Sequence, residues 1–147
     1  MKKRSLWFFA VCLILTAPAF SQTAAEMEAL LSTDTVSYQQ AAWFVLRAAD
    51  RAVSSPEEAY SQAAEQNWLP RNAGPAGRAV LEGVSLLIMQ SFGLKGGFLY
   101  NLTKNPHYAY RELVFQDIIQ GRADPTMTVS GEFLLFITGR VLSRVED

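Results

Sequence analysis

HYAYRELVFQDIIQGRADPTMTVSGEFLLFITGRVL, residues 107–142, is the stretch that decides the fold. In both of its halves, apolar residues recur at the three- and four-residue spacing typical of an amphipathic helix. A first helix is expected over residues 107–120, and Gly121 ends it. Asp124 precedes Pro125, which disfavours helical backbone and keeps the chain extended before a second helix. The stretch therefore predicts two helices joined by a turn.

Two earlier segments begin like the second helix of this stretch. The three related strings are VSYQQAAWFVLRAAD from Val36, AVLEGVSLLIMQSFG from Ala79 and VSGEFLLFITGRVLS from Val129. They lie 43 and 50 residues apart (79 − 36 and 129 − 79), in or near the range of internal repeats. We therefore expect three degenerate helix–turn–helix units, which are residues 24–50, 56–94 and 106–145. Each unit alone would expose an apolar face, so the units should pack around a common core in an all-α domain.

The middle of the chain supports the same division. Ser55-Pro56-Glu57-Glu58 is typical of a helix start, with a serine cap, a proline in the first turn and two acids at the positive end of the helix dipole. This helix is expected to stop near Trp68, and PRNAGPAG (70–77) predicts a loop. The glycines between 93 and 97 predict a flexible link. Sustained strand alternation is absent from the sequence, which favours the all-α class.

The N-terminus is typical of an export signal. Three basic residues at positions 2–4 precede an apolar run from Leu6 to Leu15, and small residues near Ser21 suit a signal peptidase. We predict a signal peptide over residues 1–22 and a single domain over residues 23–147. The apolar run is shorter than the ~20 residues that span a bilayer, so no stable membrane span is expected after cleavage.

Cleavage would change both the cysteine content and the charge. Cys12 is the chain's one cysteine and would leave with the signal peptide, which excludes disulfides and thiol chemistry. The Lys and Arg count falls from 13 to 10 against 14 Asp and Glu, a net charge of about −4. This balance leaves no basic stripe for nucleic acid and no polybasic segment for anionic lipid. We expect no cofactor and no nucleic-acid partner.

The third unit resembles an S-layer homology (SLH) repeat. The family's His-Trp-Ala corresponds to His107-Tyr108-Ala109, and its Gly-Ile-Ile-x-Gly to Asp117-Ile118-Ile119-Gln120-Gly121. Its loop with aspartate and proline corresponds to Asp124-Pro125, and the opening of its second helix to Val129-Ser130-Gly131-Glu132. The resemblance covers unit three, and units one and two only in their second helices. It implies paired helices packed around a pseudo-threefold axis, in a bacterial envelope protein.

SLH modules attach to cell-wall glycans, often through the arginine of the Thr-Arg-Ala-Glu motif, so the resemblance implies glycan binding. The matching positions here read Ser37-Tyr38-Gln39-Gln40, Val80-Leu81-Glu82-Gly83 and Ser130-Gly131-Glu132-Phe133. All three lack the arginine, which would supply the bidentate cation that suits an anionic polymer. The alternative is a structural or protein-interaction helical domain that has lost glycan binding.

Four residues are candidates for binding a ligand in grooves between units. Tyr108, Arg122 and Asp124 would line one groove, and Tyr38 would lie near another. Aromatic rings can stack on sugar faces, whereas the alternative for these residues is core packing or helix capping. The single histidine, His107, is expected to be structural because acid–base catalysis needs a positioned partner. We expect no catalytic residue and no metal ligand, and hence no enzyme.

The sequence therefore predicts a non-catalytic exported cell-envelope module, in the periplasm or cell envelope, that binds cell-wall glycan or an envelope protein. Glycan binding predicts solvent-facing aromatic rings and a cationic groove at a unit junction. Protein binding predicts an exposed apolar patch larger than a few hundred Å². An enzyme would instead need a deep pocket with convergent polar groups around His107.

Overall fold

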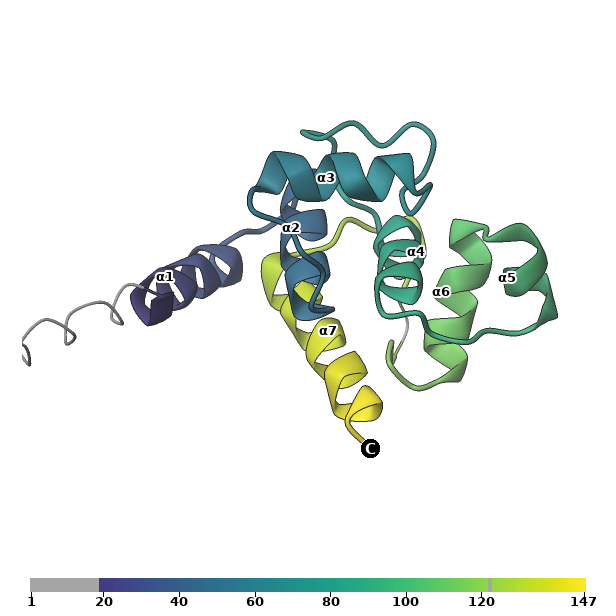
Figure 1. The fold of residues 1–147 in the computed structure, drawn as a ribbon. Helices are drawn as coiled ribbons and strands as arrows, with labels where there is room; N and C mark the ends of the chain where they lie inside the picture. The colour runs from purple at the N-terminus through teal and green to yellow at the C-terminus, as the bar shows by residue number, and fades with distance from the viewer. Residues whose placement is uncertain (1–18, 122) are drawn as a thin grey trace, which may run out of the picture.

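The computed structural model describes residues 19–121 and 123–147. These residues form seven helices and no named strand, so the all-α prediction is confirmed. The helices are α1 (Ala19–Leu31), α2 (Tyr38–Ala48), α3 (Pro56–Glu65), α4 (Leu81–Ser91), α5 (Phe98–Thr103), α6 (Pro106–Phe115) and α7 (Gly131–Val145). In Figure 1, α2, α4 and α7 form the middle of the molecule, and α1 projects to one side. Cys12 and residues 1–18 of the predicted signal peptide lie outside the described residues.

A closed ring of three backbone hydrogen bonds joins the residues that precede α2, α4 and α7. The N–H of Val36 donates to the carbonyl of Val129 (2.9 Å), Val129 donates to Ala79 (3.0 Å), and Ala79 donates to Val36 (2.9 Å). All three residues are fully buried. They are also the residues at which the three related strings begin, so equivalent positions of the repeats meet at one point.

A second set of bonds lies outside this ring. The first N–H group of each following helix donates to a carbonyl of another unit at 2.8–3.0 Å, and the pairs are Tyr38 with Gly77, Leu81 with Met127, and Gly131 with Thr33. Such N–H groups have no partner within their own helix. The units therefore satisfy one another's helix starts, which fixes how they sit around the ring.

Units two and three have the same spacing between their two helices. In each, 15 residues separate the first helix from the second (66–80 and 116–130). The hydroxyl of Tyr60 donates to the carbonyl of Ala73, and that of Tyr110, 50 positions later, donates to Ala123, both at 2.5 Å. These equivalent bonds tie each loop back onto the helix that precedes it.

Helices α3 and α6 end earlier than the sequence predicts, at Glu65 rather than near Trp68 and at Phe115 rather than at residue 120. The cause is a left-handed residue after each helix, Asn67 or Asp117, each with φ 58°. These two residues end the helices in the manner usually associated with glycine. The chain then turns back, which buries the residues that follow, Ile118 among them.

Unit one departs from this pattern. Only six residues (32–37) separate α1 from α2, and α1 begins at Ala19 rather than at residue 24. Helix α1 ends beside the start of α7, where a Cβ on Gly131 would overlap the Leu30 carbonyl. By contrast, α3 packs along α2 and α6 packs along α4. The first helix of unit one is therefore attached mainly by its C-terminal end.

Helix α5 directly follows the glycines that were predicted to form a flexible link. Its Tyr100 is buried against Gly96, where a Cβ would overlap the tyrosine ring. The N–H of Gly97 donates to Oε1 of Glu112 on α6 at 2.8 Å, which fixes the start of α5. The outer face of α5 is exposed and apolar, and its residues are Phe98, Leu99 and Leu102.

Candidate functional site

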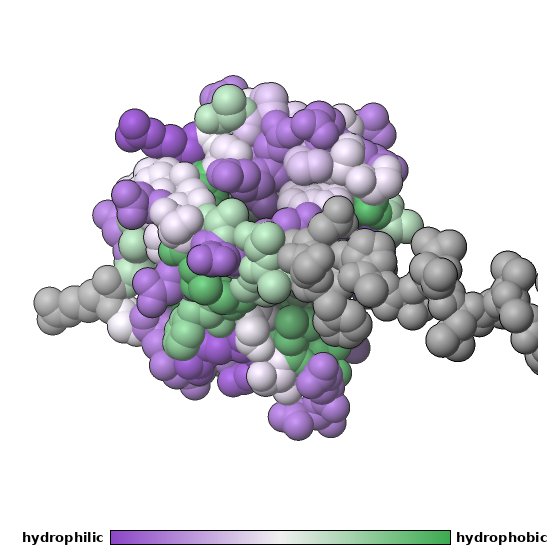
Figure 2. All heavy atoms as spheres, turned by 90° about the vertical axis from the view of Figure 1, so that its left-hand side faces the viewer, coloured by the Kyte–Doolittle hydropathy of each residue, from purple (hydrophilic) through white to green (hydrophobic). Residues whose placement is uncertain are grey.

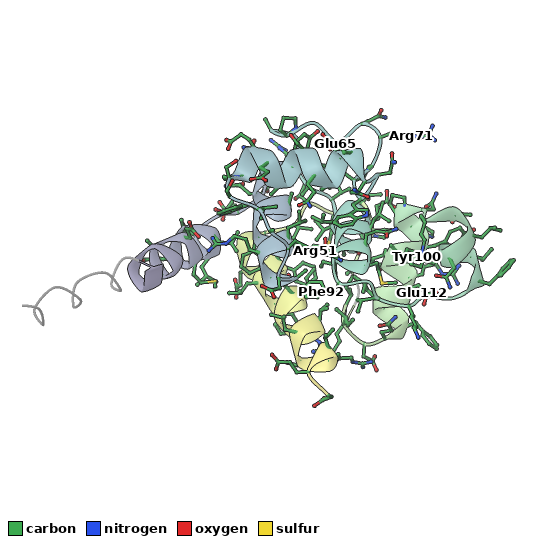
Figure 3. The ribbon with its side chains drawn as sticks, in the orientation of Figure 1. Arg51, Glu65, Arg71, Phe92, Tyr100 and Glu112 are labelled. Atoms are coloured by element: carbon green, nitrogen blue, oxygen red, sulfur yellow. The ribbon has the colours of Figure 1, made fainter. Side chains whose placement is uncertain are left out.

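A polar hollow of about 540 Å³ lies where the end of α3 and its following loop meet the α5–α6 turn. We call it the junction hollow because it lies between units two and three. It is lined by Asn67, Arg71, Thr103, Lys104, Asn105 and Pro106. Figure 3 labels Arg71 beyond the C-terminal end of α3 and Tyr100 on the neighbouring α5.

Helix ends build the rim of the junction hollow. Asn67 is the left-handed residue that ends α3, and Lys104 is the left-handed residue that ends α5, with φ 49°. Asn105 caps α6, because its Oδ1 accepts a hydrogen bond from the N–H of His107 at 2.9 Å. Pro106 then takes the first helical position, where its missing N–H costs nothing. These caps fix the backbone that presents the polar groups.

Two cations give the junction hollow its charge. The Nζ of Lys104 lies 4.4 Å from the ring centroid of Tyr100, and this cation–π contact holds the ammonium near the buried ring. Arg71 is exposed and makes no ion pair within the described part of the chain. Its guanidinium can donate in bidentate fashion to a carboxylate or phosphate. With the amides and the threonine hydroxyl, the hollow suits an anionic ligand rich in oxygen.

His107 lies outside the junction hollow, in the first turn of α6. Its Nδ1 is 3.8 Å from Oε2 of Glu82 at the start of α4, and its ring packs near those of Tyr108 and Tyr110. These contacts join α6 to α4. Neither pocket detailed on the described surface is lined by His107.

Of the four residues predicted from the sequence to bind a ligand, the three that the structure describes do not line the junction hollow. Tyr108 is half-buried against the core, and Arg122 lies outside the described residues. Asp124 is exposed, and hydrogen bonds from the Thr126 hydroxyl (2.7 Å) and N–H (2.8 Å) lower the pKa of its carboxyl. These bonds shape the turn before Pro125.

Tyr38 is a correction to the sequence prediction. Instead of lying along a groove, it is 5% exposed, and burial raises the pKa of its hydroxyl. Its hydroxyl accepts a long hydrogen bond (3.4 Å) from the N–H of Val80, and its ring covers Gly83. Tyr38 therefore fills the junction between units one and two, because Gly83 leaves room for its ring.

The positions that would hold the SLH arginine are all inside the molecule. Tyr38, Leu81 and Gly131 occupy these positions, and all three are buried. Each contributes to a contact between units through the N–H group at its helix start. Any cationic site on this molecule must therefore use other residues, and Arg71 with Lys104 form one.

The described residues hold neither a metal-binding cluster nor a membrane-spanning helix. No cluster of three or more His, Cys, Asp or Glu side chains that could hold a metal occurs among them. None of the described helices combines the length and apolarity needed to cross a bilayer. Comparison with known proteins found no matching family model, no matching curated protein and no matching solved structure.

Sequence reasoning missed the residues of the junction hollow. Arg71 sits in a stretch recognisable only as a loop, and Lys104 follows the segment that was expected to be a flexible link. The two cations are 33 residues apart (104 − 71), and no sequence pattern indicates that they lie near each other. Only the packing of α6 along α4 brings the two segments together.

Proposed function

We propose that the protein is a non-catalytic, exported cell-envelope module that binds anionic cell-wall glycan in the junction hollow. The observation that carries this proposal is the pairing of Arg71 and Lys104 at the boundary between two units. A cationic groove at a unit junction is what glycan binding predicts. The SLH resemblance of unit three and the ring of equivalent backbone positions support the same assignment.

The chemistry of the hollow fits a polymer better than a small molecule. The site is polar and partly open to solvent, and its two cations come from the end of α5 and from the loop after α3. Such a site can hold successive acidic or hydroxyl-bearing sugar units through many weak contacts, each strengthened by charge. Export to the periplasm or cell envelope, which the N-terminal sequence predicts, would bring the protein to such a polymer.

The alternative is a protein-interaction module that has lost glycan binding. Two observations favour it. The arginine positions of the SLH motif are used for packing, and the outer face of α5 exposes Phe98 (77%) and Leu102 (69%). Exposed apolar side chains gathered on one helix are typical of a protein-binding surface.

Co-sedimentation with purified cell-wall sacculi separates the two functions. The variant with Arg71→Ala and Lys104→Ala should bind at least about tenfold more weakly than the unchanged protein, because two charge-assisted contacts are lost. The binding should also weaken with added salt. The matched control carries Arg111→Ala and Arg144→Ala, which removes two exposed cations outside the hollow.

Equal losses in the two double variants would contradict the junction hollow as the glycan site. If the unchanged protein does not pellet with sacculi while its circular dichroism remains helical, glycan binding itself is contradicted. The protein-interaction function would then take its place.

A further inference from the structure

The second helix of each unit has a face against which another helix can pack, and we call this face a helix slot. In two of the three units the slot is filled. Helix α3 fills the slot on α2, and α6 fills the slot on α4. The equivalent slot on α7 would receive the first helix of unit one. Helix α1 does not take this place, because it ends beside the start of α7 whereas α3 and α6 begin beside the starts of α2 and α4.

Burial at equivalent positions shows that the α7 slot is open. Leu46 on α2 and Met89 on α4 are fully buried, whereas the matching Gly139 is exposed and a Cβ there would meet nothing within 4 Å. Leu86 on α4 is 2% exposed, whereas the matching Phe136 is 52% exposed. The α7 slot consists of Glu132, Leu135, Phe136 and Gly139.

The surface is hollowed at this place. A depression of about 330 Å³ is lined by Ser130, Glu132, Phe133 and Phe136. Figure 2 looks onto the side from which α1 projects and shows apolar surface in the lower half of the molecule, to which α7 descends in Figure 1. The open slot is therefore mainly apolar, with the Glu132 carboxylate at one end and the Arg140 guanidinium 5.5 Å from the ring centroid of Phe136.

The two filled slots show what kind of helix fits. Each filling helix begins with proline and buries an alanine at its fourth position and an apolar residue at its eighth, which are Ala59 and Ala63 in α3 and Ala109 and Leu113 in α6. The second residue of each helix contacts the start of the receiving helix. The two pairs are Glu57 with Gln39 (2.9 Å) and His107 with Glu82 (3.8 Å).

Glu132 is the residue of α7 that matches Gln39 and Glu82, and it is exposed. An incoming helix would bring its second residue opposite this carboxylate, so a basic residue is favoured there and an acidic one is disfavoured. Helix α1 of a second copy fits poorly, because residues 24–31 carry Glu26 and Glu28 and no cation. The charge therefore favours a different protein as the source of the helix.

We propose that the α7 slot binds a short amphipathic helix of a partner protein, with a small apolar residue at its fourth position, an apolar residue at its eighth and a basic residue at its second. The incoming helix would complete the pattern that α3 and α6 set. This inference does not rest on glycan binding, since the α7 slot and the junction hollow share no residue.

The chain itself supplies the probes for a test. Peptide 104–117 (KNPHYAYRELVFQD) contains α6, and peptide 54–67 (SSPEEAYSQAAEQN) contains α3 with Glu57 at the second helical position. Titrated into the full chain and followed by NMR or calorimetry, the α6 peptide should bind at least about fivefold more tightly than the α3 peptide. A His107→Lys version of the α6 peptide should bind more tightly still.

Variants of the protein test whether the peptide binds in the α7 slot. Leu135→Glu should weaken binding of the α6 peptide at least about tenfold, because it puts a carboxylate on the apolar contact. Glu132→Lys should weaken it about two- to fivefold and reverse the preference between the two peptides. Glu146→Lys makes the same charge change outside the slot and should leave the affinity unchanged. Glu132 is exposed and Leu135 half-buried, so circular dichroism should report an intact fold in each variant.

Three results would overturn the proposal. One is the absence of binding by both peptides at about 1 mM, the weak limit for a short segment. Another is binding that Leu135→Glu and Glu132→Lys leave unchanged, because the peptide would then occupy another surface. The third is self-association in analytical ultracentrifugation that Leu135→Glu abolishes, because the slot would then receive a second copy of this chain.

Discussion

The loops at 66–80 and 116–130 make matching hydrogen bonds at several equivalent positions, with little sequence in common. Besides the left-handed residue at the second position, they share only a glutamine, an alanine and a proline at equivalent positions. The alanine carbonyl accepts the tyrosine hydroxyl in both loops. The proline carbonyls of Pro75 and Pro125 accept from the N–H groups of Gln39 and Glu82, at 3.1 and 2.9 Å. A few groups that present backbone carbonyls are enough to keep two loops in register.

The short loop of unit one shows what is lost without these groups. Residues 32–37 contain no proline, and within the described residues the N–H of Glu132 has no bond matching those of Gln39 and Glu82. The junction between units three and one is held instead by Thr33 and by the close approach of Leu30 to Gly131. This junction is therefore less extensively bonded than the other two.

The largest expected effect comes from breaking this junction with Gly131→Ala. The new methyl group would overlap the Leu30 carbonyl, and backbone cannot move aside as a flexible side chain can. We expect the free energy of unfolding in urea to fall by about 3 kcal/mol. Gly139→Ala is the matched control on the same helix, and it should raise stability by about 0.5–1 kcal/mol because the space is open. A loss below about 1 kcal/mol for Gly131→Ala would contradict the close approach.

The next effect concerns α5, the helix between units two and three. Burial raises the pKa of Tyr100 to about 12, whereas an unfolded tyrosine titrates near 10. The stabilisation from keeping this hydroxyl neutral is therefore fully present below about pH 10 and is lost as the pH rises towards 12. Between pH 9 and 11.5 the unchanged protein should lose about 2 kcal/mol more stability than Tyr100→Phe. If urea unfolding shows that the free energies of unfolding of the two proteins change equally across this pH range, the hydroxyl is not buried.

The smallest expected effect tests whether the two loops are energetically alike. Tyr60→Phe and Tyr110→Phe each remove one hydroxyl–carbonyl hydrogen bond of 2.5 Å and keep the ring. Each should lower the free energy of unfolding by about 1 kcal/mol, with similar values for the two variants. Thermal unfolding followed by circular dichroism would measure both. If only one variant loses stability, the two equivalent hydrogen bonds contribute unequally to the free energy of unfolding.

The helical class and the repeat spacing could be predicted because helix starts leave local signals. Ser55 caps α3 as predicted, and the strings from Val36, Ala79 and Val129 meet at equivalent points. These features depend on residues close together in the chain. Sequence periodicity reports such features well.

The helix ends and the candidate site could not be predicted in the same way. Asp117 takes a left-handed conformation usually given to glycine, so the end of α6 was placed at Gly121 instead. Tyr38 is buried because Gly83, in another unit, leaves room for its ring. Arg71 and Lys104 meet only through packing of the units. Each of these features depends on a contact between distant segments.

The ring of Val36, Ala79 and Val129 has a consequence for the order of events in folding. Its bonds connect residues 43, 50 and 93 positions apart, so closing it brings together nearly the whole described chain. A chain that stops before Val129 can form helices and the α2–α4 contact, but it cannot close the ring. Closure of the ring is therefore a late step in folding, slowed by the entropy cost of bringing distant segments together. Because the ring uses only main-chain groups, different small or medium-sized apolar residues can serve at its buried positions, whereas proline, which has no N–H, cannot. The repeats can therefore diverge in sequence around it.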